Sequence, residues 1–274
     1  MPSFKIVVAY DGTDYVGWQR QANGVSIQAL IEDALRAIDG RAVAVAGAGR
    51  TDSGVHALGQ VAAFTIERAL SPDAVVRALN AHLPDAIRIM SADEVPPSFH
   101  PRFDAIAKTY RYRIWNGEVV SPFERRYAWH VTGALDVDAM SSAARLVEGE
   151  HDFAAFQASG SDVITTVREV VESRVLRIAD CGFQGIHNPA IHNPAIHNPA
   201  IRNPQSAILA YEVTGPGFLR HMVRTIVGTL VEVGRGRQPV EWMAAVLASR
   251  DRAAAGPTAP AAGLFLIRVD YHNN

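Results

Sequence analysis

Cysteine and lysine are both scarce in this sequence. The 274 residues include a single cysteine, Cys181, which excludes a disulfide scaffold and a zinc site built from cysteines. Of the 26 basic residues only Lys5 and Lys108 are lysines, so the other 24 are arginines, the side chain best suited to bidentate phosphate contacts and to stacking on bases. No stretch approaches the ~18 consecutive apolar residues that a membrane-spanning helix needs. We therefore expect a protein of the reducing cytoplasm, without a signal peptide and without a membrane partner.

The sequence also lacks a large net charge, yet its basic residues are unevenly distributed. The formal net charge is -2, which by itself argues against a nucleic-acid partner because phosphate neutralisation needs cations. Residues 100–126 carry six Lys/Arg against three Asp/Glu, and residues 215–237 carry four arginines against one glutamate, so each segment has a local charge of +3. Such clustering fits either an RNA-binding groove on an otherwise acidic protein or arginines scattered without a binding role.

The first half of the chain alternates strand and helix patterns. Apolar residues recur at helical spacing after Ser26, a favourable N-cap, and Ser71-Pro72 opens a second helix with a cap and a proline at its first position. Their order, β-α-β-β-α-β, is that of ferredoxin-like and RNA-recognition folds. The predicted elements are strand 4–10, helix 26–38, strands 42–46 and 60–66, a helix that starts at Pro72 and stops before Pro84, and strand 86–95.

A similar order of elements recurs after Val95-Pro96-Pro97. We therefore predict an α+β protein of two ferredoxin-like or RRM-like βαββαβ lobes, residues 1–103 and 104–274, whose mixed and largely antiparallel sheets join around a central cleft. The predicted elements of the second lobe are strand 105–114, helix 136–148, strands 166–178 and 206–213, helix 218–233, an extra helix 239–249 and strand 264–270.

Residues 186–205 form a tandem repeat, three copies of Ile-His-Asn-Pro-Ala followed by Ile-Arg-Asn-Pro-Gln. Proline at every fifth position prevents a regular helix or strand. The histidines at 187, 192 and 197 raise the possibility of a metal site, but a five-residue step in an extended chain separates them by roughly 15 Å. We therefore predict an expanded, solvated loop inserted between two strands, and no metal.

The glycine-rich segment 46–60 concentrates polar residues between two predicted strands. Position 52 is an aspartate and a strand follows, so the segment is not a dinucleotide-binding loop, and Asp52 with His56 offers too few ligands for zinc or magnesium. What remains is a carboxylate close to Arg50. This carboxylate either forms an Asx-turn salt bridge or acts as a nucleophile or base that a guanidinium orients. Arg50 is one candidate for the guanidinium, and Arg224 on the predicted helix 218–233 is the other.

The stretch Lys108-Thr109-Tyr110-Arg111-Tyr112-Arg113 combines aromatic and basic residues on one predicted strand. The strand period places Lys108, Tyr110 and Tyr112 on one face and the two arginines on the other. An aromatic ring on such a surface can stack on an unpaired base, which contributes ~1–3 kcal/mol per base. Packing of the same tyrosines in the core is the alternative.

Six blocks of residues occur along the chain in a characteristic order. In that order, and over nearly the whole chain, they resemble the TruA family of tRNA pseudouridine synthases. The Gly-Arg-Thr-Asp-x-Gly-Val-His block is highly specific, and the 186–205 repeat departs from the family pattern without touching any block. The blocks are Tyr10-Asp11-Gly12-Thr13 with Gly17-Trp18-Gln19, Gly49-Arg50-Thr51-Asp52-Ser53-Gly54-Val55-His56-Ala57, Phe99-His100-Pro101-Arg102, Lys108-Thr109-Tyr110-Arg111-Tyr112, Gly149-Glu150-His151-Asp152-Phe153 and Phe218-Leu219-Arg220-His221-Met222-Val223-Arg224.

This resemblance implies an enzyme that isomerises uridine to pseudouridine at positions 38, 39 and 40 of the tRNA anticodon stem-loop, as a homodimer without a cofactor. Asp52 matches the nucleophile, which attacks the uracil ring or the ribose C1′. Tyr110 matches the residue that stacks on the uracil and is a candidate for helping to remove the C5 proton, and Arg224 matches the arginine that pairs with the carboxylate. Other motif positions are expected to bind substrate: Arg50, which helps to open the stem, and His56, Arg102, Lys108, Arg111, Arg220 and His221.

Two other classes of function remain as alternatives at this stage. A non-catalytic RNA-binding module of two RRM-like lobes would have the same element order, because a fold alone implies no reaction. A small-molecule enzyme would use the glycine-rich loop for a nucleotide, but the sequence lacks its phosphate-binding signature. Release of tritium from C5-labelled uridine in tRNA distinguishes the synthase from both.

Overall fold

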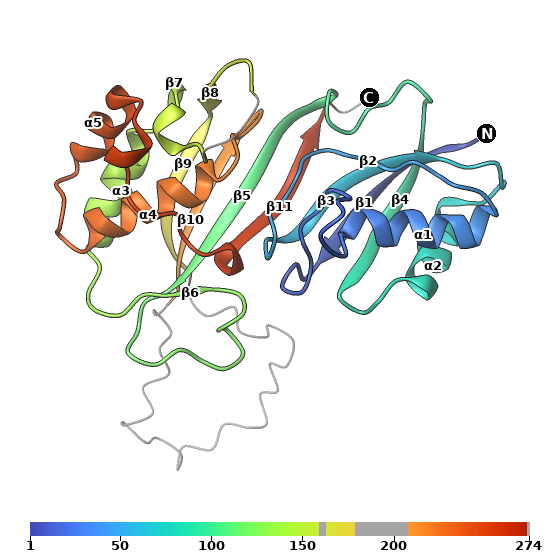
Figure 1. The fold of residues 1–274 in the computed structure, drawn as a ribbon, viewed down its shortest axis with the longest axis horizontal. Helices are drawn as coiled ribbons and strands as arrows, with labels where there is room; N and C mark the ends of the chain where they lie inside the picture. The colour runs from blue at the N-terminus through green and yellow to red at the C-terminus, as the bar shows by residue number, and fades with distance from the viewer. Residues whose placement is uncertain (159–162, 179–207, 273–274) are drawn as a thin grey trace, which may run out of the picture.

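The computed structural model describes residues 1–158, 163–178 and 208–272 (Figure 1). The N-terminal half has the predicted order of elements. Ser26 caps α1 (Ile27–Asp39) by accepting a hydrogen bond from the Ala29 amide, and Ser71 caps α2 (Pro72–His82) in the same way. The strands of this half are β1 (Ser3–Tyr10), β2 (Ala46–Gly47), β3 (His56–Thr65) and β4 (Ile87–Val95).

The N-terminal core forms between α1, α2 and the sheet. Alternate residues of β1, namely Phe4, Ile6 and Val8, are fully buried, as are Ile27 and Ile31 of α1. These positions follow the period of two of a strand and the three-to-four spacing of a helix face. Because burial of each large apolar side chain contributes about 1.5–3 kcal/mol, this packing fixes α1 on the sheet together with the loops that contact it.

The C-terminal half surrounds the apolar helix α4 (Met222–Gly234), which is buried on most of its sides. The other helices of this half, α3 (Val137–Arg145) and α5 (Trp242–Ser249), lie near α4 in Figure 1 and contact it. The strands are β5 (Ala105–Trp115), β6 (Trp129–His130), β7 (Gly149–Asp152), β8 (Val167–Val170), β9 (Glu172–Ile178), β10 (Ile208–Gly215) and β11 (Leu264–Tyr271).

The two halves share one sheet. Its strand order is β4-β1-β3-β11-β5-β10-β9, with β2 on β3 and β6 on β5, while β7 and β8 form a separate pair. Strand β11 joins the halves because it pairs in parallel with β3, where Phe265 faces His56, and antiparallel with β5, where Leu266 faces Tyr110. Figure 1 shows β11 between β5 and the N-terminal strands. The α+β class is confirmed, and the sheets of the two halves are joined through β11 into one mixed sheet.

Several element boundaries differ from the predictions for local reasons. The predicted strand 42–46 shortens to β2, because side chains of α1 bind both backbone groups of Val45, and β3 begins at His56 instead of residue 60. The predicted strand 166–178 splits at Val171, where the chain leaves the β7 pair and joins β10. The predicted helix 218–233 begins at Met222, because His221 is left-handed and cannot continue a helix toward Phe218.

The tandem repeat 186–205 and its histidines lie outside the described residues, so our predictions of a loop and of no metal there stay predictions. The domain boundary between residues 103 and 104 also stays a prediction. No helix in the described parts of the chain is long and apolar enough to cross a membrane.

Candidate active site

The loop between β2 and β3, which carries Asp52, rests against the segment that follows β1. The amide of Trp18 donates to the Thr51 carbonyl at 3.1 Å, and the amide of Gly54 donates to the Tyr15 carbonyl at 3.3 Å. Gly17 has a φ of +105°, and a Cβ at this residue would lie 2.4 Å from the Thr51 carbonyl oxygen. Only glycine adopts this conformation at such close range without displacing the loop.

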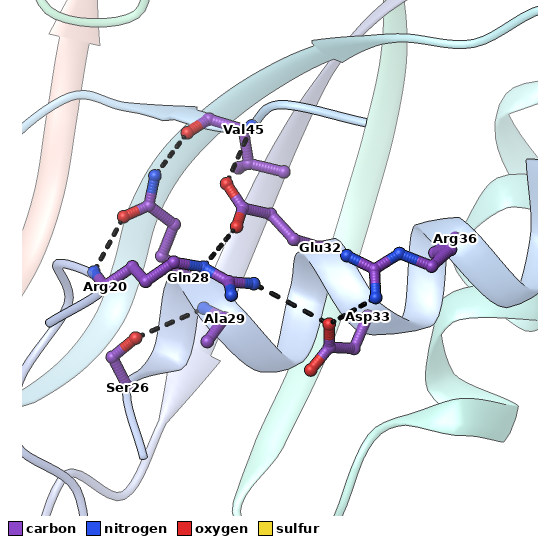
Figure 2. A network of polar contacts seen from close by, with 8 residues as sticks. All are labelled: Arg20, Ser26, Gln28, Ala29, Glu32, Asp33, Arg36 and Val45. Carbon is purple, nitrogen blue, oxygen red and sulfur yellow. Dashed lines mark hydrogen bonds and ion pairs between the residues drawn. The ribbon is translucent and has the colours of Figure 1, made fainter. Parts of the chain in front are cut away.

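Side chains of α1 bind both Arg20 and Val45, two residues that are distant in the sequence (Figure 2). Gln28 accepts a hydrogen bond from the Arg20 amide at 2.9 Å and donates to the Val45 carbonyl at 2.8 Å. Glu32 accepts from the Arg20 guanidinium at 2.8 Å and from the Val45 amide at 3.3 Å. Because Trp18 and β2 flank the Asp52 loop, this network ties the position of the loop to α1.

Asp52 contacts two residues that are distant in the sequence and lie at the start of α4. Its Oδ2 atom is 3.4 Å from Arg224 Nη1 and 3.5 Å from His221 Nε2. The Arg224 side chain is 15% exposed and that of Asp52 is 29% exposed, so the pair is partly shielded and still open to a substrate. Arg224 is itself anchored, because its Nε donates to the Ala259 carbonyl at 2.7 Å and its own carbonyl accepts from the Ala259 amide at 3.1 Å.

Tyr110 lies next to this pair on β5. Its buried ring packs edge-on against Phe218, with ring centroids 5.3 Å apart. Burial, together with the charges of Tyr10 and Asp52, raises the pKa of the Tyr110 hydroxyl well above its ordinary value. The hydroxyl is therefore protonated at neutral pH and does not act as a phenolate base.

Lys108 is a buried cation beside the same loop. Its Nζ donates to the Pro216 carbonyl at 3.2 Å. Burial lowers the pKa of Lys108, and the charge of Arg102 lowers it further. A Cβ at Gly49 would lie 3.6 Å from Lys108 Cε and 4.0 Å from the Tyr110 hydroxyl oxygen, so the loop backbone passes within van der Waals reach of both side chains.

The structure brings together five of the predicted site residues, and three more lie exposed at the surface. Arg50, Arg102 and Arg220 are all exposed, as substrate contacts would require. The residues brought together are Asp52, Lys108, Tyr110, His221 and Arg224.

Two predicted substrate-binding residues lie elsewhere. Arg111 alternates with Tyr110 along β5, so it is on the other face of the sheet, where its guanidinium pairs with Glu212 at 2.5 Å. His56 is 1% exposed, stacks on Phe265 with centroids 4.6 Å apart and donates from Nε2 to the Ala262 carbonyl at 3.1 Å. His56 is therefore enclosed in this structure, whereas the Arg111 side chain is 36% exposed beside Glu212, and the substrate-binding roles of both stay predictions.

His56 belongs to a buried polar cluster that joins the two halves. Its Nδ1 is 3.1 Å from both the Gly12 amide and Asp11 Oδ1. The ring nitrogen cannot accept from the amide and donate to the carboxylate at once. Because burial lowers the pKa of His56 more than Asp11 raises it, we assign the neutral ring, with Nδ1 as acceptor. Tyr127, from the loop before β6, donates to Asp11 Oδ2 at 2.8 Å and closes the cluster.

Our predictions from the sequence gave no role to Tyr10, Phe218 and Ala259, which lie around the site. Tyr10 hydrogen-bonds Thr51 through the two hydroxyls at 2.8 Å, and burial raises the pKa of Tyr10 to about 12. Phe218 packs on Tyr110 and Ala259 anchors Arg224. Tyr10 and Phe218 lie inside the motif blocks, and this position in the sequence could have identified them. Ala259 acts through its backbone, which no sequence pattern reveals.

The arrangement is chemically suited to nucleophilic attack by a carboxylate. One oxygen of Asp52 contacts Arg224 Nη1, and the carboxylate is near enough to the buried Tyr110 to raise the pKa of its hydroxyl. Within the described residues, no three His, Cys, Asp or Glu side chains gather in a way that could hold a metal ion.

Comparison with known proteins gives one consistent answer. A family model described as tRNA pseudouridine synthase matches residues 6–104 and 143–272. The chain is 44% identical over 273 residues to a tRNA pseudouridine synthase A of Myxococcus xanthus, covering 100% of this chain and 93% of that protein. It is also 44% identical over 271 residues to a tRNA pseudouridine synthase A of Geobacter sulfurreducens, covering 99% of this chain and all of that protein.

Proposed function

Because the chain belongs to the tRNA pseudouridine synthase family, we propose that Asp52 is the nucleophile with which it isomerises uridine in tRNA. The protein is an isomerase that forms pseudouridine. The alternative of a non-catalytic RNA-binding module has no support in these relatives. The observation that supports Asp52 is its contact with Arg224, on a loop that Gly17 approaches closely, near enough to Tyr110 for its charge to raise the pKa of that hydroxyl.

We propose that the targets are uridines 38, 39 and 40 of the anticodon stem-loop. A uridine in a stem must leave the helix before a side chain can reach it, at a cost of a few kcal/mol. The arginines Arg50, Arg102 and Arg220 are exposed and can offset that cost through phosphate contacts. The buried ring of Tyr110 then receives the flipped base by stacking.

The reaction moves the same atoms from one arrangement to another. In one route the Asp52 carboxylate adds to C6 of the uracil, and in the other it displaces uracil from the ribose C1′. In both, the bond between N1 and C1′ breaks, the base turns, a bond forms between C5 and C1′, Asp52 is released, and C5 loses its proton while N1 gains one. No oxidant or reductant is consumed. Since Tyr110 is protonated at neutral pH, it can assist only by passing on its own proton as it accepts the one from C5.

The decisive experiment measures release of tritium from [5-³H]uridine in tRNA with no added cofactor. Release by the wild-type protein, together with pseudouridine at position 38, 39 or 40, is the expected result. Tight tRNA binding without release would contradict the proposal. We further propose that the protein acts in the cytoplasm as a homodimer, which sedimentation of the purified protein tests.

Arg224→Lys is expected to lower turnover by about 10²-fold although the charge is kept. One planar guanidinium contacts both Asp52 and the Ala259 carbonyl, and an ammonium cannot hold both. Single-turnover rates measure the effect. Arg41→Lys is the matched control, because Arg41 pairs with Asp39 at 2.9 Å outside the site. Equal rates for Arg224→Lys and wild type would make Arg224 a simple phosphate contact.

Tyr110→Phe is expected to lower turnover by about 10²-fold if the hydroxyl relays a proton, with little change in tRNA affinity because the ring remains. Phenylalanine fills the same buried space as the Tyr110 ring, so the melting temperature should change little. Tyr110→Ala serves as the comparison, because it removes the stacking surface as well and should weaken binding. A Phe variant that turns over like the wild type would limit Tyr110 to stacking.

A further inference from the structure

His221 has a backbone conformation that is unfavourable for its residue type. Its φ is 63° and its ψ is -2°, and Arg250 is the other non-glycine residue with positive φ in the part of the chain that the structure describes. A left-handed conformation costs roughly 1–2 kcal/mol for a residue with a Cβ, and glycine avoids most of this cost. Such strain persists where the surrounding structure requires it, often at functional sites.

Helix capping does not account for histidine at this position. A typical N-cap residue is extended and its side chain accepts a hydrogen bond from the first turn. His221 precedes α4 in a left-handed conformation, and its side chain makes no capping hydrogen bond. Only its carbonyl serves the helix, by accepting from the Thr225 amide at 2.9 Å, and any residue type could do this.

The imidazole of His221 instead lies against Asp52. Its Nε2 atom is 3.5 Å from Asp52 Oδ2, the same oxygen that Arg224 Nη1 approaches at 3.4 Å. Catalytic contacts in a free enzyme are often this long and shorten when substrate binds. Within the described residues no hydrogen bond reaches the other oxygen, Oδ1. The two basic side chains therefore meet on one side of the carboxylate.

We propose that His221 is a positioning residue for the nucleophile: together with Arg224 it holds Oδ2 of Asp52 and so presents Oδ1 to the substrate. The proposal rests on the proposed role of Asp52. It gives His221 a task different from the substrate contact that the sequence suggested, because the imidazole acts through the carboxylate and not on the RNA.

The charge state of the ring fits this role. Burial lowers the pKa of His221, Asp52 partly opposes this, and the positive charges of Arg224, Arg220 and Arg252 lower it again. These are the charged groups that face the ring. His221 is therefore neutral at neutral pH, and in the tautomer with hydrogen on Nε2 it can donate to Oδ2 without adding a second full positive charge beside the nucleophile.

The test uses His221→Gly, because glycine relieves the backbone strain while it removes the imidazole. We expect an unchanged or higher melting temperature, tRNA affinity within about twofold of wild type, and a kcat lowered about tenfold or more. His221→Asn, which tolerates the left-handed conformation and keeps an N–H donor, should recover part of the loss. Imidazole added to the buffer should partly restore the Gly variant, which a purely structural role would not allow.

Arg250→Gly is the matched control, since it relieves the other positive φ at a residue that pairs with Asp152 and not with Asp52. It should keep the wild-type kcat. A Gly variant of His221 with wild-type kcat, or with a raised KM alone, would overturn the positioning role. Failure of wild type to release tritium, or full activity of Asp52→Asn, would instead overturn the proposed function, so the two failures are distinguishable.

Discussion

Asp52→Asn is expected to leave the protein folded and able to bind tRNA but to reduce turnover by on the order of 10³-fold or more. An amide is nearly isosteric with a carboxylate, and its oxygen can still accept from Arg224. It is not an equivalent nucleophile, however, and cannot form the covalent intermediate. The Arg224 guanidinium loses its charged partner but is 15% exposed and keeps its hydrogen bond to the Ala259 carbonyl, so the fold should be retained.

Three measurements on one preparation check this expectation: single-turnover tritium release, tRNA affinity and melting temperature. Asp14→Asn is a suitable control, because Asp14 is an exposed carboxylate in the neighbouring loop and its loss should leave turnover unchanged. If Asp52→Asn kept a rate within about tenfold of wild type, the loss would be too small for a missing nucleophile and the assignment would fall.

Gly17→Ala is expected to lower the free energy of unfolding by about 2–4 kcal/mol and to remove most of the turnover. Its φ of +105° is unfavourable for alanine, and the added Cβ would lie 2.4 Å from the Thr51 carbonyl oxygen. That carbonyl belongs to the residue before Asp52 and accepts a hydrogen bond from Trp18. The loop must therefore move, and the nucleophile moves with it.

Gly133→Ala separates the two causes of the expected destabilisation, which are the backbone strain at positive φ and the collision of the Cβ with Thr51. Gly133 has a φ of +81°, but a Cβ there would meet nothing within 4 Å, so the substitution costs only the backbone strain. Urea unfolding and tritium release, measured on both variants, give the difference that the collision with Thr51 makes. Equal destabilisation in the two variants, with normal turnover in both, would show that the close approach of Gly17 does not hold the loop.

Sequence patterns predicted the local elements well where caps and periodicity agreed. Ser26 and Ser71 mark the starts of α1 and α2 within one residue. The start of α4 was predicted four residues too early, because Phe218 and Leu219 continue the apolar pattern of the helix. In the structure Phe218 packs on Tyr110 instead, and periodicity does not distinguish these two uses of an apolar residue.

Contacts between distant residues could not be derived from local pattern. Asp52 and Arg224 are separated by 172 positions. The residues alone left Arg224 as one of two candidate partners, and the resemblance of the motifs to a family selected it. The same motifs name His56 and Arg111 as substrate contacts, and these roles stay predictions, since a motif position does not show which way a side chain points. His56 is buried in a cluster with Asp11 that joins the halves, and Arg111 faces Glu212.

The central place of β11 in the sheet bears on how the chain folds during its synthesis. Strand β11 follows all the other strands along the chain, and its pairing with β3 brings residue 265 against residue 56. Until β11 is made, β3 presents an open edge at His56 and Ala57, beyond the part that β2 pairs, and such edges promote pairing with other chains. Contacts this distant along the chain also form slowly. Strand β11 joins the half that carries Asp52 to the half that carries Tyr110, and it is synthesised last. The growing chain is therefore most prone to aggregation before β11 is complete.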